Sequence, residues 1–498
     1  MKSPILKRFL IVVGLVLGGA ILLFPFLSPN RRRNPAGQTR PQLASQETES
    51  LSIDSISTPI SNETENAQES SNNEAQEQVS QVTTSDPIDA WSRFRGPNGQ
   101  GISDDTKIPL TWSDSENLSW KTDLPGAGAS SPVLTEHFVF VTSYSGYGLS
   151  ANKPGEMKDL SRHISCIERA SGKILWTQSV PAVLPEDRYQ GMGVPEHGYA
   201  TNTPVTDGKR VYVFFGKAGV FAFDLNGEQL WRATVGTESG NRGWGTASSL
   251  ILHNNILIVN ASEESNAIYG LDCETGNKLW NASASLLELA YGTPIAVPID
   301  EKRTDIVIAV PEEVWGLDPS NGKLRWFASM KLTGNVAPSV VVDDSMMYIF
   351  GGYNSSGSLA IRKGGSGDIS KSHIAWTSRN SSYVATPVLY QGRLYWINDR
   401  GMAYCEKADS GELVYRERVE GMSSGGRPVY ASPILIGDKI YVQTRESGLF
   451  VLEASEQYKV LARNSFESDK TIFNATPAVS RGQLFLRSDK ALYCISQK

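Results

Sequence analysis

The sequence predicts an all-β protein, an eight-bladed β-propeller of four-stranded antiparallel blades, and three observations lead to this fold class. A Thr, Ser or Ala followed by Pro, or a near equivalent, opens a short apolar run eight times along the 498 residues. From the second opening onward the spacing is 44 to 49 residues, and four strand-like runs fill each interval; this period is typical of propeller blades. The two ends of the repeat array also complement each other. The openings are at Ser131, Thr203, Ser248, Thr293, Ala337, Thr386, Ser432 and Thr476.

The second repeat shows why each interval holds four strands. After Thr203 and Pro204, the pair Asp207 and Gly208 precedes a run of Val, Tyr and Phe at residues 211–215. Gly and Asp favour turns, whereas β-branched and aromatic residues favour a pleated sheet. A third run (residues 221–223) and a fourth run that contains Trp231 complete the interval. We therefore expect one four-stranded blade per repeat.

The last repeat has room for only three strands between Thr476 and the end of the sequence. The missing outer strand is available upstream at residues 118–122, whose Trp120 lies where the repeat usually has a tryptophan. Pairing of this strand with the last repeat would close the ring and cover edges that could otherwise pair with other chains.

Two insertions interrupt this pattern. Residues 144–162 lengthen the first repeat, and residues 183–198 separate it from the second. Insertions of this kind form loops on one face of a propeller, where binding residues are common.

The N-terminus contains an apolar run of 19 residues, 9–27, preceded by Lys2, Lys7 and Arg8. This is about the length that a membrane-spanning helix needs. No small-residue cleavage site follows the run, so residues 1–27 are predicted to be an uncleaved signal anchor rather than a cleaved signal peptide. The basic residues at 31–33 compete with those before the run and leave the orientation open; we expect the propeller outside the cytoplasm.

Residues 28–90 contain no aromatic residue, cysteine or lysine and are rich in Ser, Gln, Glu, Asn and Thr. Such a segment buries too little apolar surface to offset its chain entropy. We predict a disordered linker here, so that three parts result: the anchor at 1–27, the linker at 28–90 and the propeller at 91–498. The net charge of -6, with mixed signs along the chain, argues against nucleic-acid binding.

Small and bulky residues recur at fixed places within the repeats. Three of the four cysteines, Cys166, Cys405 and Cys494, fall where other repeats have Ala or Gly, which favours unpaired structural thiols over disulfides; Cys273 lies in a turn. One tryptophan in most repeats indicates docking between neighbouring blades, with the indole N–H bonded to the adjacent backbone. These tryptophans are Trp120, Trp176, Trp231, Trp280, Trp326 and Trp376.

The repeat pattern, with Thr203-Pro204, Ala222, Asp224, Gly227 and Trp231 in order, resembles that of PQQ-binding-like β-propellers, a superfamily that includes quinoprotein dehydrogenases and BamB scaffolds. Residues 91–101 further resemble a BamB-like bacterial subfamily. The resemblance covers residues 91–498 and implies the fold, but the fold alone does not decide the function.

A quinoprotein dehydrogenase would imply bound PQQ, a Trp floor beneath it, and a calcium ion held by Glu and Asn with an Asp as base. Many soluble members also have a disulfide of adjacent cysteines, and this chain has no such pair. No position accepts the Glu, Asn and Asp set, and the five histidines have no metal-ligand spacing. We therefore predict no catalytic residues, no metal and no cofactor, and keep PQQ as an alternative.

Residues just before each inner strand should line the mouth of the central channel. Aromatic rings mixed with a few polar groups there suit a small molecule or a peptide, although the rings could instead simply fill the channel. The candidate binding residues are His197, Tyr199, Arg242, Trp244, Glu288, Tyr291, Asn335, Tyr383 and Arg427. Asn202, Thr246, Tyr430 and Asn474 hold equivalent positions.

Together these observations predict a non-enzymatic scaffold, tethered by one span to the bacterial cell membrane with a periplasmic propeller, that binds envelope proteins or peptides. Two alternatives stay open, a PQQ-dependent oxidoreductase and a propeller that senses a ligand. The oligomeric state does not follow from the sequence.

Overall fold

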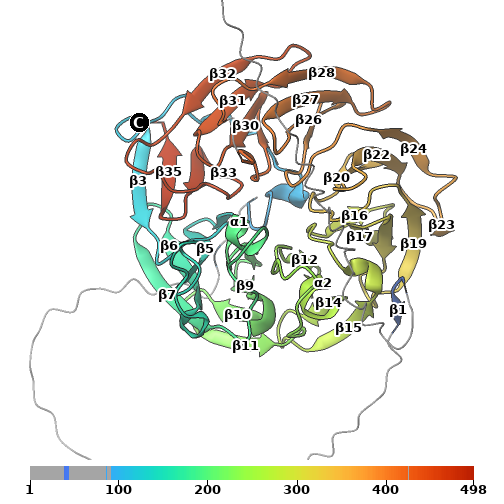
Figure 1. Ribbon diagram of the computed structural model, residues 1–498, viewed down its shortest axis with the longest axis horizontal. Helices are drawn as coiled ribbons and strands as arrows, with labels where there is room; N and C mark the ends of the chain where they lie inside the picture. Colours follow the sequence, from blue (N-terminus) through green and yellow to red (C-terminus); the bar gives the residue numbers. More distant parts are fainter. Residues whose placement is uncertain (1–38, 44–85, 87–90, 424–425, 498) are drawn as a thin grey trace, which may run out of the picture. The chain divides into compact units, whose positions relative to one another are not determined.

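The computed structural model describes residues 39–43, 86, 91–423 and 426–497, all within one compact unit, Gln38–Lys498. Eight sheets are arranged around a central axis as the blades of a propeller (Figure 1). The prediction of eight four-stranded antiparallel blades is confirmed. The predicted anchor at 9–27 lies outside the described residues, as does most of the linker. Within the part that is described, no helix has the length and hydropathy of a membrane span.

Each of the first four blades is built from four consecutive strands, ordered from the axis outward. Blade 1 contains β4 (Val133–Leu134), β5 (Phe138–Ser145), β6 (Ser161–Glu168) and β7 (Ile174–Pro181), and blade 2 contains β8 (Val205–Thr206), β9 (Arg210–Phe214), β10 (Val220–Asp224) and β11 (Gln229–Ala233). Blade 3 contains β12 (Ile251–His253), β13 (Ile256–Ala261), β14 (Ala267–Asp272) and β15 (Lys278–Ser283), and blade 4 contains β16 (Ile295–Pro298), β17 (Thr304–Val310), β18 (Glu313–Leu317) and β19 (Leu324–Ser329).

The next three blades repeat this order. Blade 5 contains β20 (Val341–Val342), β21 (Met346–Gly351), β22 (Gly357–Arg362) and β24 (Ile374–Ser378), and blade 6 contains β25 (Val388–Tyr390), β26 (Arg393–Ile397), β27 (Met402–Lys407) and β28 (Leu413–Arg418). Blade 7 contains β29 (Ile434–Ile436), β30 (Lys439–Gln443), β31 (Leu449–Glu453) and β32 (Val460–Asn464).

Blade 8 closes the ring with strands from both ends of the propeller. It contains β33 (Ala478–Ser480), β34 (Gln483–Arg487), β35 (Ala491–Ser496) and, as its outer strand, β3 (Leu118–Asp123). β3 runs antiparallel to β35, with Trp120 opposite Cys494. The closure expected from residues 118–122 is therefore present.

Among the residues that the structure describes, three short strands join blades as extra edges, and six short helical segments lie in the connections. β1 (Gln42–Leu43) extends blade 3, β2 (Ile102–Ser103) pairs with β29, and β23 (Gly367–Asp368) pairs with β19. The helical segments are η1 (Pro97–Gly99), η2 (Met157–Asp159), α1 (Val194–His197), η3 (Gly216–Ala218), α2 (Ser262–Ser265) and η4 (Ser285–Leu287).

The Ser and Thr residues that open the repeats join neighbouring blades around the axis. The hydroxyl of one opening accepts a hydrogen bond from a backbone N–H of the blade before it, as Thr203 does from Ser131. Six such bonds of 2.9–3.0 Å are present among the described residues. In blade 5 the N–H comes from Ser339, two residues beyond the predicted opening at Ala337. This bonding explains why a hydroxyl residue recurs at the openings.

The tryptophans of the fourth strands dock on the next blade. Trp120, Trp176, Trp231, Trp280 and Trp376 each donate the indole N–H to a backbone carbonyl of that blade, at 2.9–3.0 Å.

Trp326 departs from this prediction, because its indole donates to the Asp305 carboxylate of its own blade at 2.8 Å. The reason lies in blade 5, where residues 363–373 replace the tight turn that receives the tryptophan elsewhere. They lead through β23, which pairs with β19 beside Trp326.

The described cysteines, Cys166, Cys273, Cys405 and Cys494, are buried free thiols. Cys166, Cys405 and Cys494 each face the tryptophan or tyrosine of the neighbouring outer strand, at Trp176, Tyr415 and Trp120 respectively. A small side chain is needed opposite such a large ring, which agrees with the Ala and Gly of other repeats.

Candidate functional site

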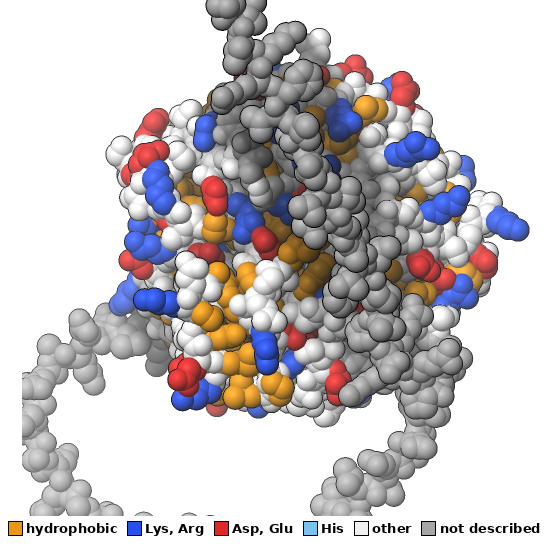
Figure 2. Space-filling model, viewed as in Figure 1, with side chains coloured by type: hydrophobic (Ala, Val, Ile, Leu, Met, Phe, Trp, Pro, Cys, Tyr) orange, Lys and Arg blue, Asp and Glu red, His pale blue; other side chains and the backbone are white. Residues whose placement is uncertain are grey.

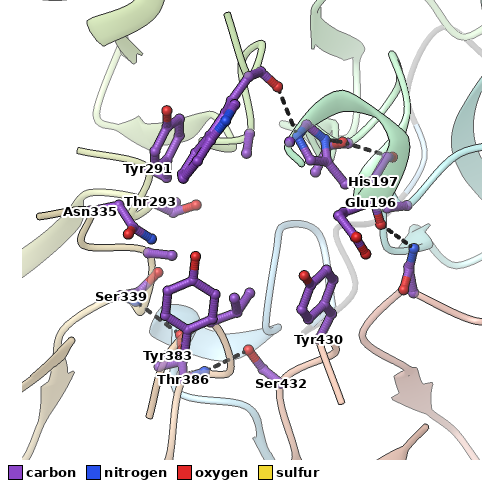
Figure 3. Close-up of a pocket in the computed structure, with 18 of the residues that line it drawn as sticks. Glu196, His197, Tyr291, Thr293, Asn335, Ser339, Tyr383, Thr386, Tyr430 and Ser432 are labelled. Atoms are coloured by element: carbon purple, nitrogen blue, oxygen red, sulfur yellow. Dashed lines mark hydrogen bonds between the residues drawn. The ribbon is translucent and has the colours of Figure 1, made fainter. Parts of the chain in front are cut away.

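A cavity of about 240 Å³ lies at the centre of the ring, where the connections enter the inner strands. Figure 3 shows tyrosine rings and polar side chains from several blades pointing into the same space. Among the residues that line it are Glu196, His197, Trp244, Tyr291, Asn335, Tyr383, Arg427 and Tyr430. The lining thus combines aromatic surface with a small number of charged and amide groups, as ligand pockets do.

The floor of the cavity is formed by residues 91–101, which we call the plug. Phe94 of the plug lines the cavity, and Figure 3 shows the plug in pale blue behind the side chains. Backbone bonds tie it to separate blades, from Leu134 N–H to Trp91 O and from Leu435 N–H to Gly101 O. The plug is therefore attached to blades 1 and 7 behind the cavity.

Arg95 holds the plug in place. Its side chain is fully buried, and its guanidinium donates only to backbone carbonyls, at distances of 2.7–3.1 Å. The acceptors are Gly99, Gln100, Thr386, Pro387 and Pro433. A buried guanidinium needs such a full set of acceptors. Two blade openings supply three of them, and the plug itself supplies the other two.

One wall of the cavity is built by Trp244 and its neighbours. Trp244 stacks on Tyr291 with centroids 6.1 Å apart, and Arg242 lies 5.8 Å from the Trp244 ring. His197 Nε2 donates to the Trp244 carbonyl at 3.0 Å, and His197 Nδ1 lies 2.7 Å from the Thr201 hydroxyl. Burial lowers the pKa of His197 to about 4, so that a neutral ring fastens the Trp244 loop to α1.

The opposite wall carries cations stacked on tyrosines. The Arg427 guanidinium lies 4.4 Å from the Tyr383 ring centroid, and that of Arg445 lies 4.9 Å from Tyr430. Arg445 also forms an ion pair with Glu196 at 2.7 Å. Stacking on both rings fixes the positive charges near the cavity and leaves aromatic edges toward it.

Two buried carboxyl groups lie behind the Trp244 wall. Glu263 and Glu264 of α2 are each 3% exposed, and three of their four carboxyl oxygens have no hydrogen-bond partner. Burial, with the nearby charges of Asp187 and Glu288, raises the pKa of Glu263 to about 7. Burial, with the charge of Glu263, raises the pKa of Glu264 to about 8. The Glu264 carbonyl accepts from the Glu238 N–H at 3.0 Å, so α2 supports the loop that carries Trp244.

The two insertions pack together beside the cavity. Tyr144, Tyr147 and Tyr199 form a buried aromatic cluster there, with Tyr144 and Tyr199 centroids 5.4 Å apart. Three apolar side chains of the insertions are exposed, Leu149 (55% exposed), Leu184 (52%) and Met192 (58%). Figure 2 shows apolar side chains gathered on this face near α1 and the strands of blade 2.

Seven of the nine predicted binding residues line the cavity: His197, Arg242, Trp244, Tyr291, Asn335, Tyr383 and Arg427. Two do not. Tyr199 turns into the tyrosine cluster, where its hydroxyl donates to the Asp187 carbonyl at 2.6 Å, and Glu288 accepts from the Asn241 amide. That the seven bind a ligand stays a prediction.

The structure also brings residues to the cavity that the sequence did not single out. Phe94 comes from the plug, which is remote in sequence from most other lining residues, and Met192 and Glu196 come from the second insertion. The sequence showed that an insertion is present at residues 183–198. It did not show that this insertion contributes side chains to the cavity. Within the described ranges, no group of three or more His, Cys, Asp or Glu residues is arranged to hold a metal ion.

Comparison with known families places this architecture. The family described as outer membrane protein assembly factor BamB matches residues 160–412, just over half of the chain. The chain belongs to this family. It is a PQQ-like β-propeller, as the resemblance of its repeats implied. No curated protein matches the chain.

Solved structures share the fold at low sequence identity. BamB from Moraxella catarrhalis is 15% identical with a TM-score of 0.53, covering 76% of this chain and 98% of that protein. A europium-containing methanol dehydrogenase is 9% identical with a TM-score of 0.56, covering 83% of this chain and 98% of that protein. A BamB and a dehydrogenase thus share the ring, and the fold does not separate scaffold from enzyme.

Proposed function

We propose that this BamB-like propeller is a non-enzymatic scaffold, tethered to the bacterial cell membrane through residues 9–27, with its propeller in the periplasm, where it binds envelope proteins. The observation that carries the proposal is the pair of insertions. They expose Leu149, Leu184 and Met192 to solvent and share a buried tyrosine cluster beside the cavity.

Exposed apolar side chains held in a fixed arrangement favour a protein partner. An apolar patch rimmed by polar residues is characteristic of protein interaction sites. The cluster is well anchored, because Lys217 donates to the Pro185 carbonyl at 2.7 Å and Arg162 pairs with Glu186 at 2.7 Å. A partner would therefore bind without the cost of ordering these loops.

The cavity lining favours a scaffold over the quinoprotein alternative. A quinone cofactor with calcium needs several oxygen ligands around the metal, carboxylates among them. Among the described residues that line the cavity, Glu196 is the one carboxylate, and it is already paired with Arg445. Trp244 stacks on Tyr291 rather than lying free as a floor. These residues do not fit such a site, and we derive no reaction from them.

A photo-crosslinking amino acid at Met192 tests the scaffold proposal in intact cells. We expect it to capture one defined envelope protein, whereas the same probe at Leu413, which is 42% exposed on the outer strand β28, should not. Equal crosslinking patterns from both positions would contradict the proposal.

Dye reduction tests the quinoprotein alternative. Purified protein supplied with PQQ and either calcium or europium should reduce no dye with alcohols or sugars. Robust reduction that depends on PQQ would overturn the non-enzymatic assignment and favour an oxidoreductase.

A ligand-sensing propeller is the second alternative, favoured by the cavity with its aromatic walls and its stacked Arg427. A small ligand would raise the melting temperature with its concentration, because it binds only the folded state.

A further inference from the structure

The edge of β15 in blade 3, together with Glu313 and Phe327 of blade 4, holds a short piece of chain from far upstream. We call this site the groove. β1 adds to the outer strand β15 in antiparallel register, with Gln42 opposite Ser283 and Leu43 opposite Ala282. Figure 1 shows β1 beside β15 and close to β19. Blade 3 thereby gains a fifth strand. Residues 39–43 belong to the segment for which the sequence predicts a disordered linker.

Arg40 gives the contact its specificity. Its guanidinium makes three hydrogen bonds of 2.6–3.0 Å to the Glu313 carboxylate and lies 3.4 Å from the Phe327 ring centroid. A planar guanidinium is suited to both contacts at once, whereas a lysine ammonium is not. Glu313 raises the pKa of Arg40, and Asp368 on β23 adds to this effect. The groove is therefore matched to an arginine in charge and in shape.

Glu313 belongs to a built pocket rather than to an open surface. Its side chain is 8% exposed, and it also accepts from Trp315 Nε1 at 2.7 Å. Removal of the arginine would leave a buried carboxylate without its ion pair, which is costly. Pro41, which follows, is buried, and a proline disfavours helix for the residue before it. An Arg-Pro pair thus enters the groove already extended, ready for strand pairing.

We propose that this groove is a docking site for extended peptides with the pattern Arg-Pro followed by two strand-forming residues, and that a segment of this kind from a partner protein displaces residues 39–43. Strand addition at a sheet edge supplies affinity through the backbone, and a side-chain pocket supplies selectivity. The resident segment is short and covalently attached, so it competes through a high effective concentration rather than through a large contact. The site is on the outer wall and is independent of the central cavity and of the insertions.

A labelled peptide with the sequence of residues 38–46 tests this directly by fluorescence anisotropy on the detergent-solubilised full chain. In the wild type, the resident segment competes with the peptide. Arg40→Ala in the protein weakens that segment, so the peptide should bind this variant at least about tenfold more tightly than the wild type. Adding Glu313→Gln to Arg40→Ala should weaken peptide binding by at least about tenfold.

Two matched controls separate docking from general effects. Glu312→Gln, at the exposed neighbour of Glu313, should leave peptide binding to the Arg40→Ala protein unchanged. A peptide in which Arg40 is replaced by Ala should fail to bind any of the proteins. This peptide tests the role of the arginine even if the Glu313→Gln protein does not fold. Equal affinity of the peptide for the wild type and Arg40→Ala, or equal binding of the two peptides, would overturn the proposal.

Discussion

The glycine in the turn of a blade makes room for the tryptophan of the blade before it. At Gly322, an added Cβ would lie 2.4 Å from Cε3 of Trp280, and the backbone has φ of +70°. Trp280 in turn donates to the Pro319 carbonyl of the same turn at 2.9 Å. Ring, glycine and carbonyl therefore form a unit that recurs around the propeller, for example at Gly276 beside Trp231 and at Gly411 beside Trp376.

Gly322→Ala tests this unit, with Gly392→Ala as its control. Both residues have a φ near +70°, but no atom lies within 4 Å of a Cβ built at Gly392. The control should cost only the backbone strain, about 1 kcal/mol, whereas Gly322→Ala should cost about 1–3 kcal/mol more because the tryptophan must shift. Urea unfolding of both proteins measures the difference. Equal losses would show that the ring does not need the space.

At the scale of an element, α2 packs two buried glutamates, Glu263 and Glu264, against the loop that carries Trp244. Glu263 and Glu264 lie beneath the loop of residues 236–246, and an added Cβ at Gly240 would lie 2.3 Å from the Glu263 carboxylate. The carboxylates of Asp187, Glu186 and Glu288 act on this pair through their charges and keep its pKa values high. α2 is therefore best accommodated with its acids protonated.

The stability of the protein should fall as the pH rises because of Glu264. The pKa of Glu264 is raised in the folded state. Its contribution to the free energy of unfolding is therefore complete below the unfolded pKa of about 4.5 and is lost as the pH rises through about 8. Glu264→Gln should therefore match the wild type near pH 4.5 and exceed it by about 2–4 kcal/mol at pH 9. Thermal unfolding at both pH values tests this, with the exposed Glu301→Gln expected to have no such effect. A Glu264→Gln protein that keeps the wild-type pH profile would refute it.

At the scale of the whole molecule, stability depends on the closure of the ring. β3 supplies the outer strand of blade 8, and its Trp120 donates to the Arg169 carbonyl of blade 1 at 3.0 Å. One segment thus completes the last blade and docks it on the first. Without β3, blade 8 would lack its outer strand and the Trp120 contact with blade 1.

Deletion of residues 118–122 should lower the melting temperature by about 10 °C or more, or prevent folding. Replacement of residues 40–43 by Gly and Ser is the matched comparison, because β1 is also an added outer strand but closes nothing. That change should shift the melting temperature by only a few degrees, about what the loss of a local contact costs. A closing-strand deletion that melts like the intact protein would mean that the ring does not need it.

The sequence by itself determined the number of blades, their four strands and the closing strand, because each of these follows from local turn and strand preferences repeated at a fixed period. It also located the loop positions before the inner strands, and with them seven of the nine residues at the cavity. Tyr199 and Glu288 hold equivalent loop positions but do not line the cavity. The direction of a loop side chain depends on its neighbours in space, which the sequence pattern does not give.

Only the tertiary structure decided the rest. That Phe94 forms the floor, that Arg95 draws its acceptors from two distant blades, and that Arg40 lies against Glu313 are contacts between residues hundreds of positions apart. They have no period and no local signal, because they arise from shape and charge complementarity that exists only once the ring has closed. The repeat encodes the ring, whereas folding of the non-repeated segments onto it creates the sites.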